Sequence, residues 1–200
     1  MQDVERGVLS GVNDLPWQTD TSNGDWFYAE GDNYKTGPEV IRMLADIVSK
    51  NGNLLLNVVM YPDGSLPPES QALLTDLAGW MRVNSEAIHG TRPWRVFGEG
   101  PTEIASGAFQ EKADYTSADI RFTTRGQSLY AITLGEPQGM VAIKSLGRAA
   151  GYDTRPVRRV RMLGHPKRLE FSHTDVALVI HLPDAVTTRH AAAFEILFAT

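Results

Sequence analysis

One short apolar segment constrains the fold of this chain more than any other feature. Residues 54–59, Leu-Leu-Leu-Asn-Val-Val, are bounded by Gly52 on one side and by Pro62-Asp63-Gly64 on the other, and both boundaries are turn signals. A short apolar run between turns is typical of a strand that is buried on both faces, as in a parallel sheet. The segment therefore predicts an interior strand of an α/β structure.

A helical pattern lies on each side of this predicted strand. The apolar positions before it recur at helical spacing and are Val40, Ile41, Leu44, Ile47 and Val48. A capping-box pattern from Thr36 to Glu39 begins that helix, and Asn51-Gly52 supplies a left-handed end. After the strand, residues 67–69 (Pro-Pro-Glu) open a second helix. The order helix, strand, helix indicates an α/β region.

The sequence pattern changes near residue 97. Seven short apolar segments separated by turn sequences follow, at residues 120–124, 129–134, 140–143, 157–163, 168–172, 176–182 and 193–198. Short strands at this spacing predict an antiparallel β-sandwich. We therefore divide the chain into an α/β region, residues 1–96, and a sandwich domain, residues 97–200, joined by Gly98-Glu99-Gly100-Pro101. We expect the sandwich to fold on its own.

Composition excludes several classes of function. The chain has no cysteine, which rules out disulfides and thiol chemistry, and its five histidines form no metal-binding motif. A net charge of -5 disfavours a nucleic-acid partner. The basic residues 155–168 alternate with apolar ones and indicate a solvated strand face. No apolar run approaches the roughly 18–20 residues of a membrane-spanning helix.

The first 35 residues combine aromatic and acidic side chains in a stretch that resembles a loop. Its members are Trp17, Trp26, Phe27, Tyr28, Tyr34, Asp14, Asp20, Asp25, Glu30 and Asp32. Sugars bind to such surfaces, because their C–H faces stack on aromatic rings while carboxylates accept hydrogen bonds from their hydroxyls. A surface loop anchored by buried aromatic side chains explains the same pattern. A carboxylate beside aromatic surface can also have its pKa raised enough to act as a general acid.

Several longer motifs resemble one enzyme family. They are VERG, PWQTDTSNGDWFY, VIRMLADIVSKNGNLLLNV, DGSLPPES and WMRVNSEAIHGTRPW, in this order over residues 3–96. Together they resemble the α-L-fucosidases of glycoside hydrolase family 29, whereas the last hundred residues resemble that family's C-terminal domain only in character. The resemblance implies the terminal portion of a (β/α)8-like barrel followed by an antiparallel β-sandwich. It also implies a fucosylated oligosaccharide or glycoconjugate as substrate.

The resemblance also implies roles for individual residues. Family members are retaining enzymes with an Asp nucleophile and a Glu general acid/base, and they use no metal or organic cofactor. Glu5 matches the acid/base, with a surface ion pair to Arg6 as the alternative interpretation. Trp26 matches the aromatic residue that lines the fucose pocket, and Trp17 belongs to the same motif. For both tryptophans, core packing remains the alternative.

The front of the chain departs from the family pattern. In the family the nucleophile lies well upstream of the Pro-Trp motif, whereas only 16 residues precede Trp17 here. A complete barrel takes about 250 residues. We therefore expect a C-terminal part that lacks the nucleophile and self-associates through an exposed barrel edge. The alternative is a non-catalytic carbohydrate-binding or structural β-sandwich module.

The cellular compartment stays open at this stage. The first ten residues, MQDVERGVLS, contain no apolar segment of the kind found in a signal peptide. Members of the resembling family are mostly secreted, periplasmic or lysosomal. The sequence itself does not choose among these locations.

Overall fold

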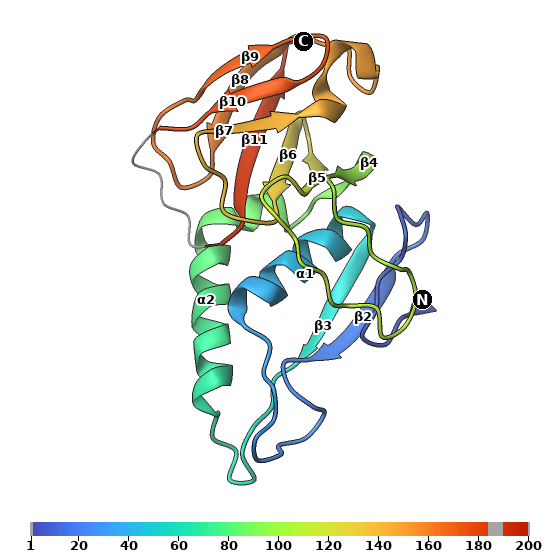
Figure 1. The fold of residues 1–200 in the computed structure, drawn as a ribbon, viewed down its shortest axis with the longest axis vertical. Coiled ribbons are helices and arrows are strands. Elements are labelled where there is room, and N and C mark those ends of the chain that lie inside the picture. Colours follow the sequence, from blue (N-terminus) through green and yellow to red (C-terminus); the bar gives the residue numbers. More distant parts are fainter. Residues whose placement is uncertain (1, 184–189, 200) are drawn as a thin grey trace.

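The computed structural model describes residues 2–183 and 190–199, and places two α-helices and eleven strands among them (Figure 1). The helices are α1 (Gly37–Ser49) and α2 (Pro68–Asn84). The first strands are β1 (Gln2–Asp3), β2 (Trp17–Ser22) and β3 (Gly52–Asn57). The later strands are β4 (Arg92–Glu99), β5 (Ile120–Arg125), β6 (Ser128–Thr133), β7 (Met140–Ile143), β8 (Val157–Met162), β9 (Glu170–His173), β10 (Leu178–His181) and β11 (Ala192–Phe198). Neither α-helix is long and apolar enough to cross a bilayer.

Both predicted helices are confirmed. The capping box of α1 is present, and the Thr36 N–H donates to the Glu39 carboxylate at 2.6 Å. After α1, Asn51 adopts a positive φ of 70° and turns the chain into β3. α2 begins at Pro68, as the Pro-Pro-Glu pattern predicts. Local signals therefore account for the start of both helices and for the end of α1.

The strand predicted at residues 54–59 is present, but its bounds and environment differ from the prediction. β3 runs from Gly52 to Asn57 in a three-stranded parallel sheet of order β1-β2-β3, and α1 connects β2 to β3. The expectation of burial on both faces is wrong, because Leu55 is 55% exposed. Among the described residues β3 is hydrogen-bonded to β2 alone, so its other edge is open.

β2 lies within the stretch that the sequence suggested was a loop. Its sequence, Trp-Gln-Thr-Asp-Thr-Ser, is polar and gives no strand signal. Two of its threonines are nevertheless fully buried and hydrogen-bonded through their hydroxyls. Thr19 donates to the Gly7 carbonyl at 2.6 Å and Thr21 to the Glu111 carboxylate at 2.6 Å. Side-chain hydrogen bonds therefore replace the apolar contacts that usually mark an interior strand.

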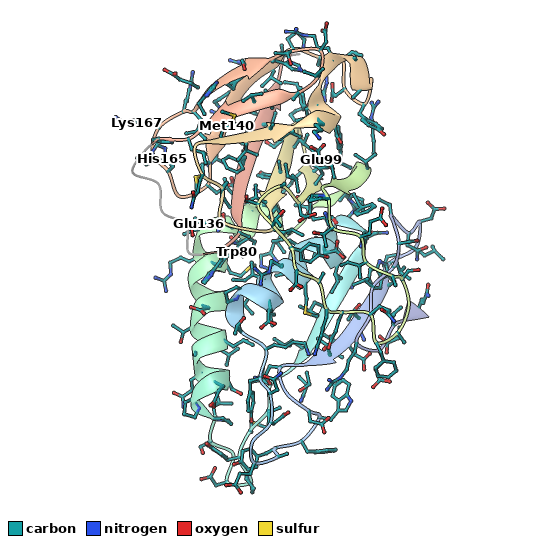
Figure 2. All side chains as sticks on the ribbon, viewed as in Figure 1. Trp80, Glu99, Glu136, Met140, His165 and Lys167 are labelled. Carbon is teal, nitrogen blue, oxygen red and sulfur yellow. The ribbon has the colours of Figure 1, made fainter. Side chains whose placement is uncertain are left out.

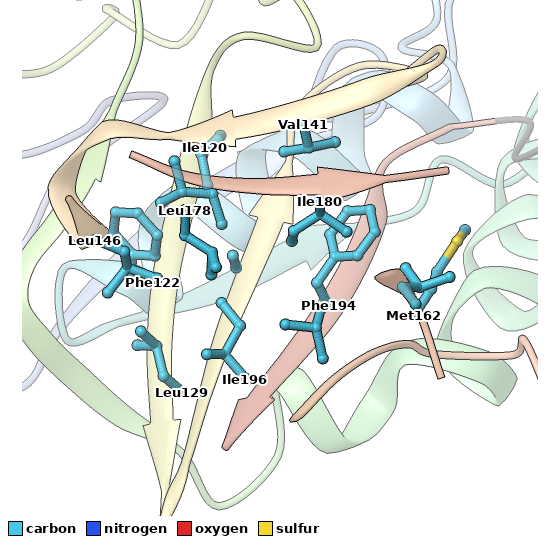
Figure 3. Close-up of a cluster of buried hydrophobic side chains, with 14 of the residues drawn as sticks. Ile120, Phe122, Leu129, Val141, Leu146, Met162, Leu178, Ile180, Phe194 and Ile196 are labelled. Carbon is cyan, nitrogen blue, oxygen red and sulfur yellow. The ribbon is translucent and has the colours of Figure 1, made fainter. Parts of the chain in front are cut away.

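The predicted β-sandwich and all seven of its predicted strand segments are confirmed. A five-stranded antiparallel sheet, β4-β5-β6-β11-β8, faces a three-stranded sheet, β7-β10-β9. The core between them includes Phe122, Leu178, Ile180, Phe194 and Ile196 (Figure 3). Alternate residues of each antiparallel strand face inward, so the two sheets enclose one apolar core between them.

β4 was not predicted, and it replaces part of the expected linker. Gly98 and Glu99 pair with Arg121 and Ile120 as the last residues of this strand. β4 therefore crosses the expected boundary between residues 96 and 97. Pro and Gly made this segment look like a turn, whereas Trp94 and Val96 pack against the sandwich core.

The outer face of the five-stranded sheet packs against the two helices. This second core includes Ile41, Ala45, Trp80, Tyr130 and Ile132. The indole of Trp80 lies where α2 meets the sandwich (Figure 2), and its Nε1 donates to the Ala191 carbonyl at 2.8 Å. The division into residues 1–96 and 97–200 therefore stays a proposal about domains, because both parts share this core.

A long connection between β4 and β5, residues 100–119, returns to the parallel sheet, and we call it the strap (Figure 1). The Gly107 N–H donates to the Val8 carbonyl at 2.8 Å, and the Phe109 N–H donates to the Glu5 carbonyl at 2.9 Å. Ile104 packs against the core beneath the parallel sheet. The strap thus ties the sandwich to the N-terminal segment.

Candidate functional site

The candidate site lies where β2 and β3 end. Both strands run in the same direction, so the loops that follow them, residues 23–36 and 58–67, emerge at one end of the sheet (Figure 1). Ligands of parallel α/β proteins bind at this carboxyl end. The sequence-predicted residue Trp26 lies on the first of these loops, and Glu5 lies beside β2.

Trp26 is partly exposed and held by main-chain hydrogen bonds. Its N–H donates 2.8 Å to Oδ1 of Asp25, and its carbonyl accepts from the Asn57 side chain at 3.3 Å. The guanidinium carbon of Arg6 lies 5.3 Å from the centre of the Trp26 ring, within cation–π range. The loop therefore presents an aromatic face next to a fixed positive charge.

Arg6 is a candidate site residue that the sequence does not single out for binding. The sequence suggests an ion pair between Arg6 and Glu5, but the structure pairs Arg6 with Asp25 at 3.7 Å. The Arg6 side chain also donates to the Gly24 carbonyl at 2.9 Å. Its φ of 46° is unusual for a residue other than glycine. These contacts aim the guanidinium at the loop that carries Trp26.

Glu5 is exposed and lies in a segment that extends β1 along β2. The amides on either side of it, of Val4 and Arg6, donate to the carbonyls of Gln18 at 2.9 Å and Asp20 at 2.8 Å. Among the described residues, none forms a hydrogen bond or ion pair with the Glu5 carboxylate. This carboxylate is therefore accessible to a ligand.

Asp20 also contributes to this region. The sequence analysis placed it on a loop, but it belongs to β2 and pairs in register with Leu55 of β3. The Asp20 Oδ1 atom is buried and has no hydrogen-bond partner within residues 2–183 and 190–199. An acceptor without a donor is unfavourable in a folded protein. Asp20 therefore offers one oxygen to a donor from outside the described residues.

Trp17 does not belong to the site. Its side chain is fully buried, packs with Met43 and Ile47, and donates from Nε1 to the Lys50 carbonyl at 2.9 Å. The register of β2 places Trp17 on the sheet face covered by α1. The expected contact between Trp17 and a ligand is thus corrected, and core packing explains this residue.

A buried polar network holds the two loops in place. The Asn23 side chain donates to Ser70 at 2.9 Å, and its Oδ1 accepts from the Val59 N–H at 2.8 Å. The Asn57 side chain donates to the Ser22 hydroxyl at 2.8 Å. Fully paired networks of this kind are rigid. The sequence signal for this network is the small polar residues at the ends of β2 and β3.

A cleft of about 570 Å³ lies beside Arg6, between the 23–36 loop, the start of α1 and the strap. Lys35 and Glu111 form an ion pair of 2.8 Å in its wall. Burial raises the pKa of Tyr34, which also lines the cleft. No cluster of three or more His, Asp or Glu suited to a metal ion occurs in the described part of the chain.

Both parts of the chain match models of one protein family. The family model for α-L-fucosidase matches residues 1–86, and the model for the α-L-fucosidase C-terminal domain matches residues 112–197. The tissue α-L-fucosidase of Homo sapiens is 30% identical over 158 residues, which cover 78% of this chain and 29% of the human protein. The chain thus spans less than a third of that relative's length.

Solved structures give the same result. An α-L-fucosidase isoenzyme from Paenibacillus thiaminolyticus has a TM-score of 0.75 and 26% identity, covering 99% of this chain and 45% of its own. The Thermotoga maritima α-fucosidase in complex with fucose has a TM-score of 0.73 and 26% identity, covering 95% and 41%. With both of its parts matched by models of one family, this chain belongs to the α-L-fucosidases.

Proposed function

We propose that the chain is the C-terminal part of a retaining α-L-fucosidase that releases terminal L-fucose from oligosaccharides or glycoconjugates. Its parallel sheet and α1 and α2 form the last units of a (β/α)8-like barrel in this proposal, and the sandwich follows them. The single observation that carries the proposal is the accessible carboxylate of Glu5, one residue before Arg6, whose guanidinium lies over the Trp26 ring, in the segment matched by the fucosidase model.

Glu5 acts as the general acid/base in this proposal. It protonates the glycosidic oxygen as the leaving group departs, and then removes a proton from the water that releases fucose. An aspartate on a part of the barrel outside these 200 residues attacks C1. Retention of configuration needs the two carboxyl groups about 5–5.5 Å apart. The exposed position of Glu5 leaves room for such a partner.

Trp26 and Arg6 bind the sugar. The indole of Trp26 packs against the apolar face and methyl group of fucose, and the Arg6 guanidinium donates hydrogen bonds to fucose hydroxyls. The ion pair with Asp25 and the bond to the Gly24 carbonyl hold Arg6 in place before the sugar arrives. Preorganised donors of this kind lower the cost of ordering on binding.

The experiment titrates the 200-residue chain with L-fucose and follows saturation transfer to the sugar. Binding should be lost in Trp26→Ala and kept in Val176→Ala, whose side chain is exposed on the sandwich. Binding that survives Trp26→Ala and maps to residues 97–200 would instead support the carbohydrate-binding module. Absence of fucose binding by the unmodified chain would contradict both.

An aryl fucoside assay tests the missing nucleophile. We expect no release of nitrophenol above background from the 200-residue chain, because loss of one carboxylate of a retaining pair costs orders of magnitude in rate. Turnover that disappears in Glu5→Gln would show that another carboxylate of this chain attacks C1. Asp20 is the first one to replace in that event.

A further inference from the structure

Four large side chains lie on the two loops that carry the candidate site, two on each loop. They are Phe27, Tyr28, Met60 and Tyr61, and we call them the aromatic ledge. Phe27 is 85% exposed, Met60 55% and Tyr28 39%. The Tyr28 and Tyr61 rings meet edge to face with their centres 4.8 Å apart. The ledge is therefore built by both loops together.

The ledge is rigid at its base. The Tyr61 N–H donates to the Ser65 carbonyl at 2.8 Å, and its carbonyl accepts from the Gly64 N–H at 2.9 Å. Asp63 accepts from both the N–H and the hydroxyl of Ser65, at 2.9 and 2.7 Å, and these bonds lower the pKa of Asp63. Gly64, with a φ of 85°, permits the tight turn. Tyr61 is thus presented by a preformed turn.

The ledge and the candidate site share the loop of residues 23–36. Phe27 directly follows Trp26, whose carbonyl is held by Asn57 at the end of β3. The same loop carries Tyr34, whose pKa is raised by burial and by the nearby charges of Asp32 and Glu69. The surface therefore combines apolar ring faces with hydroxyl groups and carboxylates. A surface with both apolar ring faces and polar groups is better suited to binding a sugar than to binding an apolar protein surface.

We propose that the aromatic ledge is the subsite for the leaving group, the sugar or aryl group attached to O1 of fucose. It stacks an apolar ring face on Phe27 and Tyr61 while fucose itself lies against Trp26. This inference rests on the proposed function and adds to it the residues that select the leaving group. When a second ring covers exposed aromatic surface beside a sugar site, the burial of apolar surface stabilises the complex.

The test compares two fucosides that differ only in the leaving group. Methyl α-L-fucoside offers no ring there, whereas 4-nitrophenyl α-L-fucoside offers a flat apolar one. We expect the unmodified chain to bind the nitrophenyl compound about tenfold more tightly, since one aromatic stacking contact is worth about that factor. Dissociation constants come from titrations followed by saturation transfer.

Variants of the ledge should remove this preference selectively. In Phe27→Ala and Tyr61→Ala the ratio of the two constants should approach one while the affinity for methyl α-L-fucoside stays unchanged. Tyr61→Phe, which keeps the ring, and Val176→Ala, on the sandwich, should keep the ratio. An unchanged ratio in both alanine variants overturns the ledge alone. Failure of the unmodified chain to bind methyl α-L-fucoside overturns the proposed function, and the ledge with it.

Discussion

Asp46 holds two positive charges inside the molecule. Its carboxylate accepts from Lys50 Nζ at 2.7 Å and from Arg121 Nε at 2.5 Å, and all three side chains are at most 5% exposed. Burial lowers the pKa of Lys50, and the Asp46 charge opposes that effect. Because Asp46 and Lys50 lie at the end of α1 while Arg121 lies on β5, this group joins the helix to the five-stranded sheet.

We predict that Asp46→Ala destabilises the chain strongly. The substitution leaves two buried cations without a counter-charge, which costs about 3–5 kcal/mol of unfolding free energy. Urea unfolding followed by circular dichroism measures the change. Asp175→Ala is the matched control, because its pair with Arg148 is exposed and should contribute less than about 1 kcal/mol. Equal effects of the two substitutions would contradict the prediction.

At the scale of elements, one carboxylate anchors both ends of the strap. Oδ1 of Asp119 accepts from the Thr102 N–H at 2.9 Å, and Oδ2 accepts from the Thr102 hydroxyl and the Thr116 N–H, each at 2.8 Å. Burial of Asp119 opposes ionisation, but these hydrogen bonds prevail and lower its pKa. The ionised form of Asp119 therefore stabilises the folded strap.

This geometry predicts a pH dependence with a definite sign. Because the folded pKa lies below the unfolded value of 3.8, the contribution is complete above pH 3.8 and is lost as the pH falls through the folded pKa. Asp119→Asn should lower the free energy of unfolding by about 2 kcal/mol at pH 7, and should have little effect on it near pH 2. Urea midpoints from pH 7 to pH 2 measure this. Asp114 is exposed on the same strap, and Asp114→Asn should change neither the stability at pH 7 nor its dependence on pH.

The open edge of β3 makes self-association the expected behaviour. An exposed strand edge recruits other chains, and Leu55 adds apolar surface to this one. We predict oligomers in size-exclusion chromatography at micromolar concentration, and a shift toward monomer in Leu55→Lys. Val176→Lys adds the same charge on the sandwich and should leave the oligomers intact. A monomer in the unmodified chain would contradict this expectation.

At the scale of the whole molecule, the shared core changes what we expect of the sandwich alone. A cut at residue 97 divides β4 and exposes the sheet face that packs on α1 and α2, including Tyr130 and Ile132. We predict that residues 97–200 melt at a lower temperature and less cooperatively than the full chain. Residues 90–200, which keep β4 whole, are the control and should recover part of the loss. A cooperative melt at the full-chain temperature would restore the original expectation of an independent sandwich.

The sequence by itself determined the features that depend on neighbouring residues. Helical spacing, the Thr36–Glu39 capping box and the Asn51 turn located α1, and apolar runs between turns located seven sandwich strands. The resemblance of the motifs also named the family, and it led us to propose Glu5 and Trp26 as site residues. These signals are short in range, so they are visible before the chain folds.

Only the tertiary structure decided features that depend on partners distant along the chain. The polar strand β2 has a partner for Thr21 in Glu111, 90 residues away, and Trp17 is buried because Met43 and Ile47 of α1 pack against it. Leu55 is exposed because it alternates with Leu54, which packs on the α1 side, and so points to the opposite face of the sheet. Arg6 faces Trp26, and Tyr28 meets Tyr61, because two separate loops converge at one sheet end. No local pattern encodes such pairings, since each requires both segments to be in place at once.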